Sequence, residues 1–466
     1  MSTGLASRVA RGGVAALAIH VGGAGLTYGA QLLIARSIGA GGFGIYAYVF
    51  AWMTVMAYGA ALGFDVAMLR FVPAYRAQEA WGLLHGVIRF AERRVAALGG
   101  AVVLLGSLAI WVRGWGGGGG GALPDSLTAT FLIGLWLAPV WALLWVRSSV
   151  VRAFGGVWSA LAPDRVVRDG LLLGIVAVAH GALGWSLGAP WVMAATLASA
   201  AAGLGLVSLA LRRRMPGAVR CAVPRYTKGD WIRAALPLAA LGVAEVAMNR
   251  TGTVLLGWFG HTTEAGIYAL AFNIAFLTAL PRAAVNTLLA PAISDLFTRG
   301  DRDALQALAT RSALWTLLGA ACIAVPAAVL AEPVLGWFGR DFAAGAPALR
   351  ILLLGQVIVA GTGSQLYLLT MTGHERSAAL LMAGSTAGNA ILGAACIGLF
   401  GLTGAAVAAT VTLITGNAAM AVLVWRSLGL RPGSIAAFRL HSGRFLHRGR
   451  RPDTEKTDAE KTVASL

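Results

Sequence analysis

The chain has 466 residues, of which 58% are apolar and only 12% are charged, and its mean hydropathy is +0.74. A typical soluble domain carries about 25% charged residues, so this composition excludes a water-facing shell and with it a soluble enzyme. The net charge of +18 is compatible either with nucleic-acid binding or with a membrane topology signal, and the positions of the basic residues decide between the two.

Apolar runs of about 20 residues recur along the chain, which is the length that an α-helix needs to cross a bilayer. The other spanning fold, a closed β-barrel, uses alternating segments of about 10 residues. We therefore predict an all-α polytopic membrane protein with about twelve transmembrane helices. These helices are predicted to begin near Val14, Ile45, Val95, Leu127, Gly170, Pro190, Ala234, Ala265, Ala313, Ile351, Ala379 and Ala405.

The basic residues follow the positive-inside rule. With the N-terminus placed inside, 31 of the 37 Lys and Arg fall in inner segments, two lie within spans, and the outer loops hold only Arg36, Arg113, Arg340 and Arg350. This asymmetry predicts a multi-pass protein of a bacterial cytoplasmic (inner) membrane with both termini in the cytoplasm. It also accounts for the net charge without nucleic acid as a partner.

An internal repeat divides the chain into two halves. The tetrapeptide GIYA occurs at 44–47 and again at 266–269, an offset of 222, and the first and seventh helices begin 220 residues apart. Because six helices separate the copies, both halves start on the same side of the membrane, which predicts two six-helix bundles related by a pseudo-two-fold axis along the membrane normal. The predicted units are an N-terminal bundle at 1–211, a basic cytoplasmic linker at 212–233, a C-terminal bundle at 234–425, and a basic, disordered cytoplasmic tail at 426–466.

Three charged residues lie deep within predicted spans: Glu245 and Arg250 in the seventh helix, and Arg282 in the eighth. Each costs at least about 2.5 to 3.5 kcal/mol near a helix centre, so we predict that they have a function. Glu245 and Arg282 lie at similar depths, and a buried ion pair that only fixes packing is the structural alternative. Arg250 has no evident acidic partner, which predicts contact with water or an anionic ligand.

Neutral polar residues extend this predicted cavity. His20 and Gln31 share a face of the first helix, Asn249 precedes Arg250, and Asn286 lies one turn after Arg282. The predicted substrate-cavity residues are therefore Arg250, Arg282, Asn249, His20, Gln31 and Asn286. For the neutral members, a hydrogen bond that holds two helices together is the alternative. The sequence contains no metal-binding or catalytic motif, so we predict no cofactor and no enzymatic activity.

The segment RSIGAGGFGIYAYVFAWMTVMAYGAALGFDVAMLRFVPAY, residues 36–75, resembles the opening of polysaccharide-biosynthesis flippases, which transport O-antigen and exopolysaccharide repeat units. Residues 236–297 resemble the seventh and eighth helices of the same family, which belongs to the multidrug, oligosaccharidyl-lipid and polysaccharide exporter superfamily. The sequence departs from the family at Gly252, where an acidic residue is common.

The resemblance implies a cationic central cavity that opens alternately to each side and carries a polyprenyl-pyrophosphate-linked oligosaccharide across the membrane. It also implies coupling to a proton or sodium gradient, for which Glu245 is the candidate residue. The implied partners are the lipid-linked oligosaccharide, the lipid bilayer, and a polysaccharide polymerase with its glycosyltransferases.

Two other functions compete with this one. A multidrug or cation antiporter of the same superfamily should favour deep carboxylates, whereas this chain has one deep Glu and two deep Arg. A membrane glycosyltransferase or polymerase needs catalytic groups on large outer loops. The longest predicted outer connections are only about 20 residues, beyond the usual length of a connecting loop, and contribute only Asp125, Glu264, Glu332 and Asp341. The sequence therefore favours the flippase.

Overall fold

The computed structural model describes residues 2–115, 124–431 and 433, except for the side chains of 2–21, 113–115, 287, 288, 290, 291, 294 and 375. Every regular element in these ranges is helical. The first half contains α1 (Ser2–Ala61), α2 (Phe64–Ala77), α3 (Trp81–Trp115), α4 (Asp125–Leu135), α5 (Leu137–Ala153), α6 (Val157–Ala162), η1 (Pro163–Val167), α7 (Arg168–Ala177), η2 (Val178–Ala182), α8 (Ala189–Arg214) and the short α9 (Gly217–Cys221). The second half contains α10 (Lys228–Trp258), α11 (Thr262–Phe276), η3 (Leu277–Ala279), α12 (Leu280–Arg299), α13 (Arg302–Val329), α14 (Ala331–Gly336), η4 (Arg340–Gly345), α15 (Ala346–Thr362), α16 (Gln365–Met371) and α17 (Glu375–Leu428).

Two of these elements, α1 and α17, each consist of two helices joined at a sharp corner. Gly39 in α1 has φ 68° and Gly401 in α17 has φ 54°, a left-handed conformation that glycine adopts without steric cost. Nine helices of the described residues are long and apolar enough to cross a membrane, and α1 and α17 account for two of them. Dividing both at their corners, and adding the continuous helical stretch 157–182, gives twelve, so the predicted helix number is confirmed.

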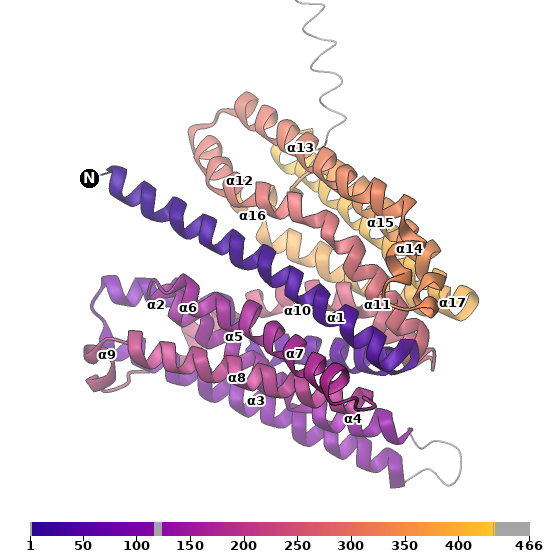
Figure 1. Ribbon diagram of the computed structural model, residues 1–466. Coiled ribbons are helices and arrows are strands. Elements are labelled where there is room, and N and C mark those ends of the chain that lie inside the picture. The colour runs from indigo at the N-terminus through magenta and orange to yellow at the C-terminus, as the bar shows by residue number, and fades with distance from the viewer. Residues whose placement is uncertain (1, 116–123, 432, 434–466) are drawn as a thin grey trace, which may run out of the picture.

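The helices form two bundles, α1–α8 and α10–α17, which lie close together at one end and diverge toward the other (Figure 1). At the end where α1 bends at Gly39, called the far end below, one apolar core joins both bundles and includes Phe43 and Phe342. At the opposite end, the described residues form two separate cores, one around Val146 that also includes Trp231 and Ala235 of α10, and one around Ile293 within the second bundle. The broad contact between the bundles therefore lies at the far end, and α10 alone joins the core of the first bundle at the opposite end.

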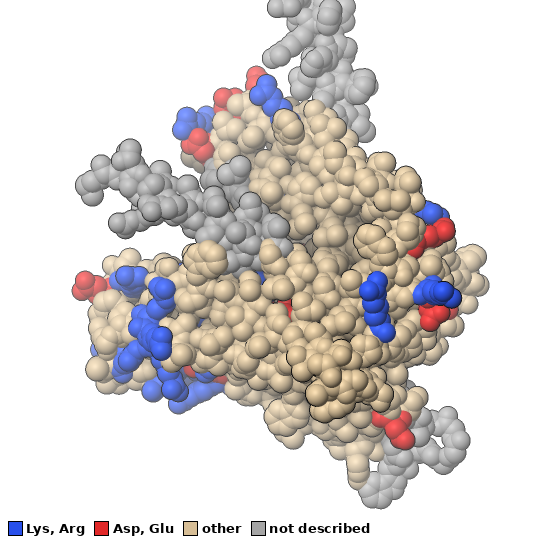
Figure 2. All heavy atoms as spheres, in the orientation of Figure 1, with Lys and Arg blue, Asp and Glu red and all other residues tan. Residues whose placement is uncertain are grey.

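The end opposite the far end is called the basic end, because α8 terminates there in the exposed Arg212, Arg213 and Arg214. Lys and Arg gather at this end of the first bundle, beside α9 and α2, at the lower left of Figure 2. The clustering agrees with the inner segments that the positive-inside rule selects.

The repeat-equivalent glycines of the two halves touch at the far end. A Cβ atom on Gly266 would lie only 2.6 Å from the Cα atom of Gly44, so neither position has room for a side chain. In a two-fold arrangement, equivalent residues contact each other only where the axis passes. This contact confirms the pseudo-two-fold relation that the repeated GIYA predicts, and it places the axis between α1 and α11.

Helix α10 follows the linker between the bundles, and it also packs against both of them. Near the basic end its buried Trp231 packs in the core of the first bundle and donates a hydrogen bond of 2.9 Å to the Tyr75 hydroxyl. Further along, α17 contacts the same helix, where Thr386 and Asn389 donate to the carbonyls of Ala244 and Met248. The deep charges of α10 therefore lie at the junction of the two bundles.

Candidate functional site

Arg250 lies on α10, roughly 12 Å before the helix ends at Trp258. Its guanidinium carbon lies 5.8 Å from the ring centroid of Phe50 on α1, a cation–π arrangement that crosses between the bundles. The residue is half-buried, and no ion pair or hydrogen bond to another described side chain or backbone group involves it. Within the described residues, this arginine is a charge inside a membrane span without a counter-charge.

Glu245 and Arg282 do not form the ion pair that the structural alternative requires. No nitrogen to oxygen distance between them is within 4.0 Å, and neither takes part in any other ion pair of the described residues. Glu245 is exposed and Arg282 is half-buried. Gly242, one turn before Glu245, faces α1, where a Cβ atom would lie 3.4 Å from Tyr58. Since residues three apart share a helix face, Glu245 also lies on the side of α10 that faces the first bundle.

The neutral residues of the predicted cavity differ in their surroundings. Gln31 accepts a long hydrogen bond of 3.4 Å from Asn273 of α11, across the two bundles. Asn286 accepts a hydrogen bond from the Ser364 hydroxyl. Asn249 is half-buried beside Arg250, and the side chain of His20 lies outside the described residues. Gln31 and Asn286 thus have helix-joining hydrogen bonds, and the role of all four in substrate binding stays a prediction.

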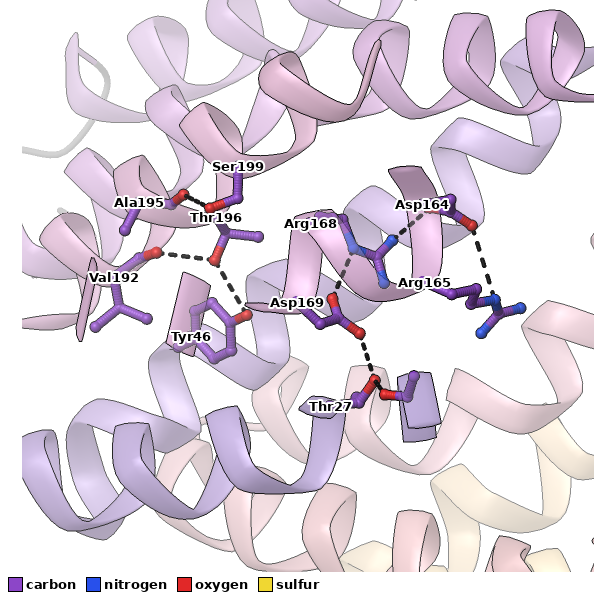
Figure 3. Close-up of polar contacts among 11 residues, drawn as sticks. Thr27, Tyr46, Asp164, Arg165, Arg168, Asp169, Val192, Ala195, Thr196 and Ser199 are labelled. Atoms are coloured by element: carbon purple, nitrogen blue, oxygen red, sulfur yellow. Dashed lines mark hydrogen bonds and ion pairs between the residues drawn. The ribbon is translucent and has the colours of Figure 1, made fainter. Parts of the chain in front are cut away.

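A second charged cluster, which the sequence reading placed in a cytoplasmic loop, lies inside the first bundle (Figure 3). Arg168 donates to Asp169 over 2.8 Å and to Asp164 over 2.9 Å, and Arg165 lies 3.8 Å from Asp164. The Thr27 hydroxyl of α1 hydrogen bonds to the second oxygen of Asp169, which is buried. The cluster therefore ties α7 to α1 through charge-assisted hydrogen bonds.

The prediction that the fifth helix begins near Gly170 was wrong, because the helical stretch starts at Val157. Hydropathy alone excludes the charged segment 164–169 from a span. The spacing of four residues between Asp164 and Arg168, and between Arg165 and Asp169, was the available signal, because pairs at i and i+4 neutralise each other on a helix. A π-helical turn, η1, immediately precedes Arg168, and such turns are frequent at functional sites.

The net charge of the deep residues stays positive when this cluster is included. Two Asp offset two Arg within the cluster, whereas Arg250 and Arg282 of the second half are matched by one deep carboxylate of that half, Glu245. In the described part of the chain, no group of three His, Cys, Asp or Glu side chains could hold a metal ion. The site is thus suited to hold an anionic group by electrostatic attraction.

The sequence departs from the flippase family at Gly252, and packing explains why this position is a glycine. A Cβ atom at this position would lie 2.4 Å from the ring of the buried Tyr268 on α11. An acidic side chain does not fit there unless Tyr268 moves. The ring of Tyr268, the tyrosine of the second GIYA copy, therefore occupies the space next to α10.

No protein family model and no curated protein matches this sequence. Among solved structures, the chain superposes on an inward-facing conformation of a multidrug resistance MATE family transporter of the MOP superfamily, with a TM-score of 0.70 at 13% identity, covering 85% of this chain and 92% of that one. It also superposes on the MATE multidrug transporter DinF-BH, with a TM-score of 0.59 at 16% identity, covering 88% and 93%. For MATE in the straight conformation the TM-score is 0.57 at 14% identity, covering 88% and 93%.

These comparisons define the fold, which is that of MATE transporters of the MOP superfamily, with two helical bundles. The chain is a multi-pass membrane protein with a transporter fold, and these structural neighbours are transporters rather than enzymes.

Proposed function

We propose that the chain is a flippase that moves polyprenyl-pyrophosphate-linked oligosaccharides across a bacterial cytoplasmic membrane. The observation that carries the proposal is Arg250, a charge at the junction of the bundles with no acidic partner among the described side chains. An arginine of this kind is costly within a span, and an anionic ligand offsets that cost. Guanidinium groups bind phosphate oxygens through two parallel hydrogen bonds.

A wet route between the bundles solves the physical problem of the substrate. A pyrophosphate with attached sugars cannot lose its water in about 30 Å of hydrocarbon, whereas its lipid tail is stable there. Arg250 and Arg282 replace part of the lost hydration as the head group passes between the bundles. The tail stays in the bilayer throughout.

The two bundles support transport by alternating access. They share a large core at the far end, whereas at the basic end of the described structure only α10 of the second bundle enters the core of the first, and the other helices have a core of their own. With the basic end placed in the cytoplasm, this state admits a head group from inside. The high TM-score to an inward-facing MATE transporter supports the same assignment.

Multidrug export is the second candidate, and it is favoured by the structural likeness to multidrug transporters. Deletion of the gene followed by lipid extraction separates the two functions. The flippase predicts that lipid-linked repeat units accumulate on the cytoplasmic leaflet, with unchanged sensitivity to drugs. Unchanged lipid-linked pools together with increased drug sensitivity would reject the flippase in favour of the second candidate.

A further inference from the structure

A small cavity of about 40 Å³ lies inside the first bundle, apart from the charges of α10. Its lining includes Thr27 and Gln31 of α1, Trp141 of α5, and Arg168 and Asp169 of α7. A cavity that holds one water needs a volume of only about 10 to 15 Å³ for the centre of that water, so this cavity has room for more than one water-sized group. It is large enough for a hydroxymethyl group or a pair of neighbouring hydroxyls.

The polar groups around the cavity have unused hydrogen-bonding capacity. The carboxylate of Asp169 receives one bond from Arg168 and one from Thr27, although a carboxylate accepts up to about four. The indole nitrogen of Trp141 is buried, and no described protein atom accepts its hydrogen. Trp141 also lines the cavity, and buried polar groups are nearly always satisfied, so its unpaired N–H group indicates a water or a ligand oxygen.

Aromatic rings connect this cavity to Arg250. Phe50, which carries the Arg250 guanidinium on its ring, also lines the cavity, and its centroid lies 5.0 Å from that of Trp141. The series continues from Trp141 to Trp145 at 6.0 Å, and from Trp145 to Tyr58 at 4.5 Å. Trp145 and Tyr58 are half-buried, so part of each ring is free to contact a ligand.

This combination matches the chemistry of a sugar. A sugar ring has an apolar face of C–H groups that packs on aromatic rings, and an edge of hydroxyls that bind carboxylate, guanidinium and amide groups. A planar aromatic cation also stacks on such rings, but here it would face the unpaired Arg250, whose guanidinium lies over the Phe50 ring. Like charges disfavour that ligand.

We propose that the cavity and its aromatic wall bind the sugar attached to the pyrophosphate, while Arg250 binds the pyrophosphate itself. The inference rests on the proposed function and adds a sugar-specific subsite to it. Phe50 contributes to both subsites, because its ring contacts the Arg250 guanidinium and also lines the cavity. Asp169 and Trp141 then select for a glycosylated lipid over a bare polyprenyl pyrophosphate.

Native mass spectrometry of the purified full chain can test this with two probes. One is undecaprenyl pyrophosphate, and the other is the same lipid carrying one N-acetylglucosamine. Trp141→Phe removes the N–H group but keeps an aromatic face, and we expect about fivefold weaker binding of the glycosylated probe, as for one lost hydrogen bond. Asp169→Asn should weaken binding of the same probe about tenfold, because a carboxylate forms stronger hydrogen bonds than a neutral amide. Neither variant should change binding of the sugar-free lipid.

Trp191→Phe is the matched control, because Trp191 of α8 packs against Trp185 away from the cavity lining. It should leave both probes unaffected. Equal effects of Trp141→Phe and Asp169→Asn on both probes, or no effect on either, would overturn the sugar subsite. If Arg250→Ala leaves binding of both probes unchanged, or if neither probe binds the wild-type chain, the proposed function itself fails.

Discussion

At the scale of single residues, the deep charges of the chain divide into paired and unpaired groups. Two carboxylates, Asp164 and Asp169, and two guanidinium groups, Arg165 and Arg168, neutralise one another within the first bundle. Buried pairs of this kind rarely add stability over apolar packing, but removing one partner is costly. Arg250 has no such partner among the described side chains, and Glu245 is exposed on α10. The unpaired groups are therefore the ones free to bind and release a ligand or an ion.

Glu245→Gln tests the coupling role of the deep carboxylate on α10. The change keeps the shape of the side chain but removes its ability to bind a proton or sodium ion. We expect transport driven by a proton or sodium gradient to fall at least about tenfold, while movement of substrate down its own gradient continues. The measurement is transport into proteoliposomes with and without each gradient.

Asp230→Asn on the same helix is the control, since Asp230 is exposed in the first turn of α10. It should leave gradient-driven transport at the wild-type level. A Glu245→Gln variant that still responds fully to both gradients would exclude this carboxylate from coupling.

At the scale of elements, the far end acts as the closed side of the molecule. The guanidinium of Arg36 donates to the Trp337 carbonyl over 2.6 Å, and Phe43 meets Phe342 with ring centroids 5.6 Å apart. Together with the contact of Gly44 and Gly266, these interactions join the bundles at the end where, in the proposed function, substrate leaves. Alternating access requires that all of them break.

A disulfide across the far end should therefore block transport. A Cβ atom on Gly41 of α1 would lie 3.8 Å from the Thr263 hydroxyl of α11, which is compatible with the short Cβ separation of a disulfide. We expect Gly41→Cys with Thr263→Cys to cross-link on oxidation, in a chain whose Cys221, Cys322 and Cys396 are replaced by Ser. Transport should stop after oxidation and recover after reduction.

Each single cysteine variant serves as a control and should transport normally under oxidation. Efficient cross-linking with undiminished transport would show that the bundles need not separate at the far end. The account of the far end as a gate would then be wrong.

The sequence predicted most elements because a membrane span has a strong and simple signal. Apolar runs located the spanning helices, although the third and ninth begin at Trp81 and Arg302 rather than near Val95 and Ala313. The repeated GIYA identified both the two bundles and the axis on which Gly44 and Gly266 meet. The start of the fifth helix was predicted wrongly because Asp164 and Arg168 neutralise each other only through helix geometry. Hydropathy takes no account of such pairing. Depth along a helix likewise predicted Glu245 and Arg282 as neighbours, but depth does not specify whether the two side chains meet.

At the scale of the whole molecule, orientation decides the direction of transport. The basic end carries Arg212 to Arg214 on α8 and the exposed Cys221 on α9, and an exposed Asp341 lies in η4, next to the far-end residue Phe342. Because Lys and Arg are retained on the cytoplasmic side, the basic end should face the cytoplasm. Both bundles then receive substrate from the leaflet on which it is made.

Thiol labelling can check this orientation in spheroplasts with a membrane-impermeant reagent. We expect Asp341→Cys to react in intact spheroplasts and Cys221 to react only after permeabilisation, with the other cysteines replaced by Ser. A reversed pattern would place the basic end outside and would contradict the proposed direction of transport.

The central claim is that an unpaired arginine between two bundles carries an anionic lipid head group across the membrane. Its most direct test is the rate at which a fluorescent undecaprenyl-pyrophosphate sugar changes leaflets in proteoliposomes that contain wild type, Arg250→Ala, Arg250→Lys or the exposed control Arg233→Ala of the same helix. We predict a loss of about 10- to 100-fold for Arg250→Ala, as expected for one charge-assisted phosphate contact, partial activity for Arg250→Lys and wild-type activity for Arg233→Ala. Equal rates for Arg250→Ala and wild type would contradict the claim.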